Sequence, residues 1–292
     1  MSRVRRLWWV IAGVGSVALL GACSANSTGQ GVPSKGSSSQ AVEADAGMEH
    51  IHNLMLADGS LLIGTHEGLW MQQGTSPVAR IGKSHFDVMG LARTSDGLVA
   101  SGHPGEGEEQ VNDLGLRGSS DLGKTWNNIS LFGKVDFHRL VASSMTVLGI
   151  SAHDGALLRS DDSGKTWKTL VNPGLYDLAI DPADSSMIVG TAQNGPVRSA
   201  DGGRTFTAIP GSPLIALLSW DDTRLVGVTP AGVLFESTDK GITWRKIATV
   251  KGEPSALSVR GDEIALLTDS TVYYSKDGGI TFAPRIVGVM GH

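Results

Sequence analysis

Histidines with nearby carboxylates are the residues of this chain most suited to chemistry. Seven of the eight histidines fall within residues 50 to 153, namely His50, His52, His66, His85, His103, His138 and His153. Four nearby carboxylates are candidate partners, namely Glu67, Asp87, Asp136 and Asp154. Neutral imidazole is a common ligand for zinc and copper, and a neighbouring carboxylate can bind the metal or orient the ring. These residue types predict a transition-metal site, with zinc or copper as the cofactor, or an acid/base site.

The spacing of His50 and His52 suggests how two of these rings could meet. They flank Ile51 where a Ser/Gly-rich stretch gives way to the apolar run IHNLML. Residues two apart on a strand project from the same side, roughly 7 Å apart at about 3.3 Å rise per residue. Two alternatives stay open. Imidazoles can cap strand ends without any ligand, and clustered histidines can act as a pH sensor without any metal.

A repeated motif defines the elements that must position these side chains. The frame Ser-x-Asp-x-Gly-x-Thr-(Trp/Phe) occurs five times, with starts 41, 39, 38 and 38 residues apart. Its aspartates are Asp121, Asp162, Asp201, Asp239 and Asp277. In such a frame Asp accepts hydrogen bonds from its own turn, Gly takes a positive φ, and the hydroxyls of Ser and Thr close the turn. The motif therefore predicts a structural hairpin turn rather than a catalytic aspartate.

This frame resembles the Asp-box, or BNR repeat, of bacterial sialidases, sortilin-type receptor domains and propeller assembly factors of photosystem II. The resemblance implies that each box lies on the turn between the third and fourth strands of a propeller blade. It also implies that the innermost strand of each blade starts on the face that carries a ligand site. All seven histidines would then share one face, around the first three blades.

The stretches between the boxes read as short strands separated by turn residues. The unit GLYDLAID, MIVGTAQ, NGPVRSAD and TFTAIP contains four of them, and two units upstream of the first complete repeat keep the same rhythm. We therefore predict an all-β fold, a β-propeller of six four-stranded blades with the box in five of them. No spare strand is evident for closing the ring, so five or seven blades remain alternatives.

The second unit carries an insertion, GHPGEGEEQVNDLGLRGSS, between its second and third strands. On the histidine face it would overhang the site, and Glu106, Glu108 and Glu109 would give it negative charge. It could act as a lid or specificity loop, or it could be a solvated excursion with no role.

The N-terminal region predicts export and anchoring. Residues 1–22 combine a basic start with an apolar run too short to span a membrane, as in a secretory signal. Leu20-Gly21-Ala22-Cys23 looks like a bacterial lipobox, in which Cys23, the only cysteine, is lipidated. Residues 23–46 have the composition of a flexible tether and residues 47–292 form the propeller. The chain would face the extracytoplasmic side, with the membrane as one partner. A net charge of -5 with scattered basic residues argues against nucleic acid.

Two classes of function remain open. The segments HIHNL, THEGL, SHFDVMG, GHPG and DFH resemble a group of bacterial exported Asp-box proteins labelled as glycosyl hydrolases, which implies the same histidine and carboxylate set as the site. We favour a binding module for a metal, glycan or protein. The alternative is a glycoside hydrolase using Glu67, Asp87, Asp136 or Asp154, which would need two carboxyls about 5 Å or about 6.5 to 9.5 Å apart. The arginine cluster and tyrosine nucleophile of sialidases are not recognisable.

Overall fold

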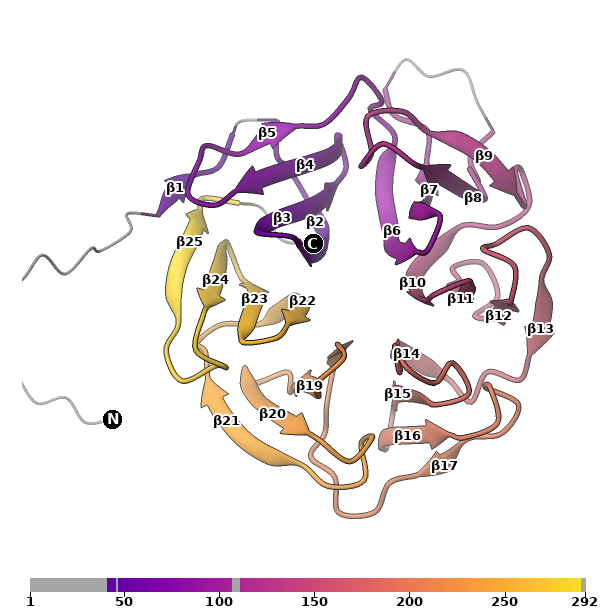
Figure 1. Ribbon diagram of the computed structural model, residues 1–292, viewed down its shortest axis with the longest axis vertical. Helices are drawn as coiled ribbons and strands as arrows, with labels where there is room; N and C mark the ends of the chain where they lie inside the picture. The colour runs from indigo at the N-terminus through magenta and orange to yellow at the C-terminus, as the bar shows by residue number, and fades with distance from the viewer. Residues whose placement is uncertain (1–40, 46, 107–110, 290–292) are drawn as a thin grey trace, which may run out of the picture. The chain divides into compact units, whose positions relative to one another are not determined.

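The computed structural model describes residues 41–45, 47–106 and 111–289, all within the compact unit formed by residues 39–292. The described residues form strands, turns and loops without any helix, so no helix there could cross a membrane. Six sheets are arranged in a ring (Figure 1). The fold is a six-bladed β-propeller, as the repeats predict. The segment predicted to be a signal, residues 1–22, and Cys23 lie outside the described residues.

The first three blades contain the residues expected to form the site. Each has four antiparallel strands that follow one another in chain order from the centre of the ring outward. The first blade contains β2 (Ile51–Ala57), β3 (Ser60–Thr65), β4 (Gly68–Gln73) and β5 (Ala79–Arg80). The second contains β6 (Asp87–Thr94), β7 (Gly97–His103), β8 (Leu116–Ser119) and β9 (Asn127–Ser130). The third contains β10 (Phe137–Ser143), β11 (Thr146–Ser151), β12 (Leu157–Ser160) and β13 (Lys168–Leu170).

The other three blades repeat this plan. The fourth contains β14 (Leu175–Ile180), β15 (Ile188–Ala192), β16 (Gly195–Ser199) and β17 (Thr207–Ala208). The fifth contains β18 (Leu217–Trp220), β19 (Leu225–Val228), β20 (Val233–Ser237) and β21 (Arg245–Thr249). The sixth contains β22 (Pro254–Arg260), β23 (Glu263–Thr268), β24 (Thr271–Ser275) and β25 (Ala283–Val287).

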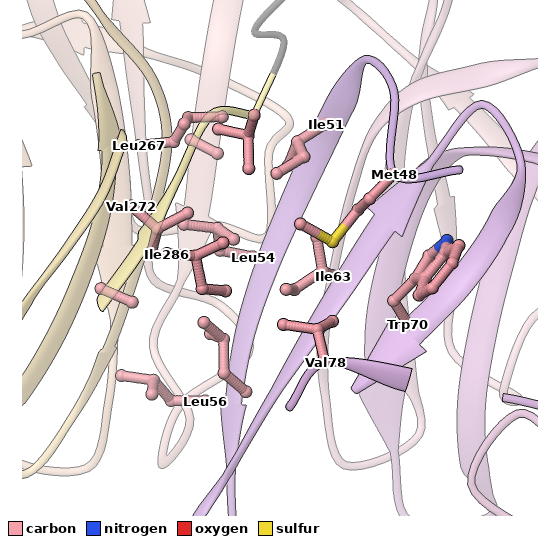
Figure 2. Packing of buried hydrophobic residues seen from close by; sticks show 14 residues of the cluster. Met48, Ile51, Leu54, Leu56, Ile63, Trp70, Val78, Leu267, Val272 and Ile286 are labelled. Atoms are coloured by element: carbon pink, nitrogen blue, oxygen red, sulfur yellow. The ribbon is translucent and has the colours of Figure 1, made fainter. Parts of the chain in front are cut away.

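The core lies between blades, because each sheet packs both of its faces against a neighbour. In β3, Leu61, Leu62 and Ile63 are all almost completely buried. Neighbouring residues of a strand point to opposite faces. Leu62 therefore packs with the second blade, whereas Leu61 and Ile63 belong to the cluster shared with the sixth. Figure 2 shows that cluster, with Leu267, Val272 and Ile286 facing Ile51, Leu54 and Ile63.

The ring closes between the first and sixth blades. The innermost strands contact one another in order around the centre, and β22 contacts β2. Arg285 of β25 donates to the Gly74 carbonyl at 3.1 Å and stacks on the Tyr274 ring. This arrangement settles the blade number at six rather than five or seven.

A short strand before the first blade adds to the sixth. β1 (Val42–Glu43) pairs in parallel with β25, with Val42 opposite Ile286, and the Ala44 N–H donates to the Val287 carbonyl at 2.9 Å. Residues 42–43 fall in the segment that composition assigns to a flexible tether. β1 forms because β25 would otherwise be the edge strand of its sheet, with unpaired backbone N–H and C=O groups. The amino-acid composition of residues 42–43 does not indicate that such an edge is available.

Each repeated motif forms the turn between the third and fourth strands of its blade. Asp162 accepts hydrogen bonds from the Thr166 backbone N–H at 2.8 Å and from the Thr166 hydroxyl at 2.7 Å. The Ser160 hydroxyl donates to Asp162 and accepts from Gly164 N–H. Equivalent bonds to the threonine recur at Asp121, Asp201, Asp239 and Asp277. These bonds lower the pKa of Asp121 and of Asp277 to about 2.

The glycine of the motif is required by both its backbone conformation and its surroundings. Gly164 has φ +88°, which favours glycine, and a Cβ there would lie 2.0 Å from the Leu116 side chain of the second blade. The aromatic residue that ends the motif contacts the same blade, since Trp167 Nε1 donates to Ser130 Oγ at 2.9 Å. The turn therefore connects neighbouring blades as well as neighbouring strands.

Candidate metal centre

The first cluster joins residues of the first and second blades. His52 lies in β2, His66 in the turn after β3, and Asp87 is the first residue of β6. Asp87 Oδ1 lies 3.1 Å from His52 Nε2, and Asp87 Oδ2 lies 3.2 Å from His66 Nδ1. The two ring nitrogens are 3.1 Å apart. His52 and Asp87 are buried, whereas the His66 side chain is about half exposed. We call this set of three residues the first triad.

The second cluster joins the second and third blades in the same way. His103 ends β7, Asp136 directly precedes β10, and His138 lies in β10. Asp136 Oδ2 lies 2.6 Å from His138 Nε2 and 3.1 Å from His103 Nε2. Asp136 is completely buried, and the two rings are perpendicular with centroids 5.9 Å apart. We call this set the second triad.

The contact made by Nδ1 of His103 determines which of its two ring nitrogens carries the proton. His103 Nδ1 lies 3.1 Å from the Asn112 carbonyl oxygen. A carbonyl can only accept, so Nδ1 carries a proton, and in the neutral ring Nε2 presents a lone pair. That lone pair lies 3.1 Å from Asp136 Oδ2, which is also an acceptor. A cation between them, either a proton or a metal ion, is required to make this contact favourable.

The carboxylates of both triads have unsatisfied hydrogen-bonding capacity. Within the described residues, Oδ1 and Oδ2 of Asp136 and Nε2 of His138 have no partner in hydrogen-bond geometry, despite their close approach. Oδ1 of Asp87 is in the same situation. Burying an ionised carboxylate without such partners is costly, and buried charges are generally paired or coordinate a metal. The donor atoms of each triad thus have the environment expected of metal ligands.

The distances also suit a small divalent ion. Zinc bound at 2.0 to 2.2 Å in a tetrahedron keeps its ligand atoms about 3.3 Å apart. In the first triad the two ring nitrogens are 3.1 Å apart, and they lie 3.1 and 3.2 Å from different oxygens of Asp87. In the second triad Asp136 Oδ2 lies 3.1 Å from His103 Nε2 but only 2.6 Å from His138 Nε2, a distance that would have to lengthen around zinc. The candidate ligand atoms of each triad all lie within 4.8 Å of one another. Three protein ligands leave one coordination position for water or another ligand.

β-Bulges direct the two strand histidines into the triads. The register of β2 against β3 shifts between Ile51 and Asn53, and that of β10 against β11 shifts between Phe137 and Arg139. His52 and His138 are the extra residues at these shifts. A bulge re-aims a side chain and is common near functional sites. Simple strand alternation would not have placed either ring correctly.

His50 lies beside the first triad in an unusual conformation. It precedes β2 and has φ 50°, a left-handed conformation that is uncommon for residues other than glycine. Its ring centroid lies 5.3 Å from that of His66. The expectation that His50 and His52 project from one side of a regular strand is therefore wrong, because one precedes the strand and the other is bulged. Both rings nevertheless approach His66.

The remaining expected residues make other contacts. Arg80 donates to the ring of His85, and Glu67 lies 3.8 Å from His85 rather than against its sequence neighbour His66. Asp154 accepts from the Ala156 N–H at 3.1 Å, and its hydrogen bond with Ser151 lowers its pKa. These residues belong to neither triad.

The insertion in the second blade is joined to the third blade by His153. His153 Nε2 lies 2.9 Å from Asp113 Oδ1, and this hydrogen bond raises the pKa of His153. Asp113 was not among the candidate residues named from the sequence. The insertion that contains Asp113 was identified there, because of its unusual length. Glu106 is exposed. Glu108 and Glu109 lie outside the described residues.

Comparison with known proteins shows the fold. The sequence matches no family model and no curated protein. The structure is similar to the GH74 xyloglucanase from Xanthomonas campestris, with TM-score 0.56 and 17% identity over 83% of this chain and 46% of that one. This chain thus spans about half the length of that enzyme.

Two further solved structures share the fold. A chain of a nidogen/laminin complex has TM-score 0.61 and 12% identity, covering 78% of this chain and 93% of that one. YCF48 bound to D1 peptide has TM-score 0.50 and 18% identity, covering 82% and 81%. The structural neighbours thus include a xyloglucanase, a chain of a nidogen/laminin complex and a protein bound to a peptide.

Proposed function

We propose that this chain is an exported, lipid-anchored Asp-box propeller that binds transition-metal ions at the two triads. The observation that carries the proposal is the contact between His103 and Asp136. The Asn112 carbonyl fixes the His103 proton on Nδ1, so that a nitrogen lone pair faces a buried carboxylate oxygen 3.1 Å away. His138 Nε2 approaches the same oxygen at 2.6 Å. A single proton can bridge only one of these two nitrogen–oxygen contacts, whereas a metal ion would accept electron pairs from His103, His138 and Asp136.

The donor set favours zinc or copper. Imidazole nitrogens with one carboxylate suit zinc, copper, iron and nickel, whereas magnesium and calcium prefer oxygen ligands. Copper(II) generally binds a given nitrogen and oxygen site more tightly than zinc. The proposal therefore expects binding of both ions, with copper(II) the tighter, and the supply of metal outside the cell would decide the natural occupant.

Binding is favoured over glycoside hydrolysis by the surroundings of the carboxylates. A hydrolase of the usual kind needs one protonated carboxyl and one ionised carboxylate facing the scissile bond. Asp87 and Asp136 each approach two imidazoles, and the lowered pKa of Asp154 opposes a role as an acid. The similarity to GH74 enzymes concerns the fold, which alone does not carry a reaction. A glycan or protein partner would bind around the metal centre.

The test is metal analysis of the full chain, purified in detergent. The protein is stripped with a chelator, reloaded with zinc or copper(II) and desalted, and its metal content is measured by mass spectrometry. We expect two ions per chain. The double variant His52→Ala/His138→Ala, which removes one ligand from each triad, should lose most of this metal. His153→Ala is the matched control, and its content should equal that of the parent. A desalted parent without either metal would contradict the proposal.

A further inference from the structure

Bulged residues recur near the start of the innermost strands. Besides the shifts at His52 and His138, the register shifts between Val88 and Gly90, between Leu175 and Asp177, and between Pro254 and Ala256. The residues at these shifts are Met89, Tyr176 and Ser255. Five of the six blades therefore have a bulge at an equivalent place. Because bulges cluster beside functional sites, this shared position points to a ligand.

All five bulged residues line one cavity. Its volume is about 450 Å³, and its lining includes His52, Met89, His138, Tyr176 and Ser255 together with Arg139. A volume of this size is within the range of small-molecule sites. Because His52 belongs to the first triad and His138 to the second, the cavity borders both.

The lining contains one cationic side chain, Arg139, and further groups that can donate hydrogen bonds. It contains an arginine, two histidines and the hydroxyls of Tyr176 and Ser255, and no carboxylate is among the described residues that form it. Arg139 also lines the adjoining cavity, where its Nε lies 3.5 Å from Asp177 Oδ1; Asp177 itself does not line the present cavity. Ser255 Oγ is buried and has no hydrogen-bond partner among the described residues. Tyr176 is exposed, so its hydroxyl is accessible to a ligand.

Bound metal would strengthen this preference for an anion. Two divalent ions carry four positive charges, of which Asp87 and Asp136 offset two. A triad that supplies three ligands also leaves a coordination position, which an oxygen of an anion can occupy. Arginine adds planar, charge-assisted hydrogen bonds that match the geometry of phosphate and carboxylate.

We infer that this cavity binds a small oxyanion, a phosphate or a carboxylate, held by Arg139 and Tyr176 beside the two triads. The inference rests in part on the proposed function, because the metal ions would supply additional affinity. The arginine and hydroxyl groups belong to the cavity whether or not metal is bound.

The test is calorimetric titration of the full chain, purified in detergent, with inorganic phosphate or with succinate. Both the chelator-stripped form and the zinc-loaded form are titrated, the latter after free zinc is removed by desalting. We expect at least one anion to bind the loaded form. Losing a charge-assisted hydrogen bond costs about a factor of ten or more, so Arg139→Gln should bind at least about tenfold more weakly. Tyr176→Phe should bind several-fold more weakly. Arg204→Gln, on an exposed turn residue away from the cavity, is the matched control and should bind as the parent does.

The outcomes separate this inference from the proposed function. A loaded chain with two zinc ions that binds neither anion overturns the inference alone. A chain that takes up no metal contradicts the proposed function, while Arg139-dependent anion binding by the stripped form would still support the cavity. Equal affinities of the parent and both cavity variants overturn the assignment to this cavity. The zinc content of Arg139→Gln is measured in parallel. If Arg139→Gln does not fold, the anion affinity of Tyr176→Phe tests the assignment to this cavity.

Discussion

Asp87 and His103 lie directly opposite each other on β6 and β7, yet their side chains belong to different triads. Asp87 reaches the histidines of the first blade, and His103 reaches Asp136 before the third. Residues opposite each other on antiparallel strands have their Cβ atoms about 4.5 to 5.5 Å apart. The second blade therefore forms a common wall of both triads.

The two triads share this wall but no ligand, so each should lose its ion separately. His66→Ala removes a half-exposed candidate ligand of the first triad, and we expect the metal content to fall from two ions to one. His103→Ala should give the same content through the second triad. Loss of both ions from either single variant would show that the triads form one inseparable site. The measurement is metal content after desalting, with circular dichroism to verify folding.

Phe137 should anchor the strand that carries His138. It is completely buried, lies 5.1 Å from Trp167 between ring centroids, and its backbone N–H donates to Ser101 Oγ. Phe137→Ala should lower the free energy of unfolding by about 3 to 5 kcal/mol, because a cavity remains in the core. Phe132→Ala, at an exposed phenylalanine, is the matched control and should change it by less than about 0.5 kcal/mol. Urea unfolding measures both, and similar values for the two variants would contradict the packing role.

The aspartates of the repeated turns should make stability sensitive to acid. The pKa of Asp121 and of Asp277 falls from 3.8 to about 2 in the fold, through hydrogen bonds within the turn. Stability contributed by a lowered carboxyl pKa is complete above pH 3.8 and lost as pH falls towards 2. The free energy of unfolding should therefore drop between pH 4 and pH 2. In Asp121→Asn this drop should be smaller, and an unchanged slope would contradict the assignment.

The His153 pair predicts an opposite dependence on pH. Its hydrogen bond with Asp113 raises the pKa of His153 above 6.5, so the stabilisation is complete below pH 6.5 and is lost as pH rises through the raised value. A proton NMR titration should find the His153 pKa above 6.5 in the parent and lower in Asp113→Asn. Asp154→Asn should have a much smaller effect, since Asp154 is the weakest of the contributing charges. Equal values in the parent and Asp113→Asn would be inconsistent with this pair.

The proposed lipid anchor depends on Cys23. In a bacterial host that processes lipoproteins, the parent should fractionate with membranes, and its mass should include the acyl chains. Cys23→Ala cannot be acylated and should lack that added mass. Cys23→Ser, which keeps a nucleophilic atom but not the thiol, is the matched variant and should also lack it. An unmodified parent with an intact N-terminal segment would contradict the proposal.

The repeated motif was sufficient to predict the blades, because a hairpin turn is stabilised by neighbours in sequence. Asp162 bonds to Thr166 and Ser160, and Gly164 supplies the backbone conformation that the turn requires. The alternating strands between the turns follow from the same local pattern. Composition also drew attention to the histidines and carboxylates that form the triads.

Only the tertiary structure decided which of these residues meet. His66 pairs with Asp87 rather than with Glu67, and His103 pairs with Asp136 from the next blade. Such contacts depend on the angle between blades and on bulges that shift the register by one residue. Neither feature could be recognised from the local sequence pattern. The chain thus determined its repeating units through short-range hydrogen bonds, whereas the closed ring, through packing between blades, determined the geometry of the candidate metal centre.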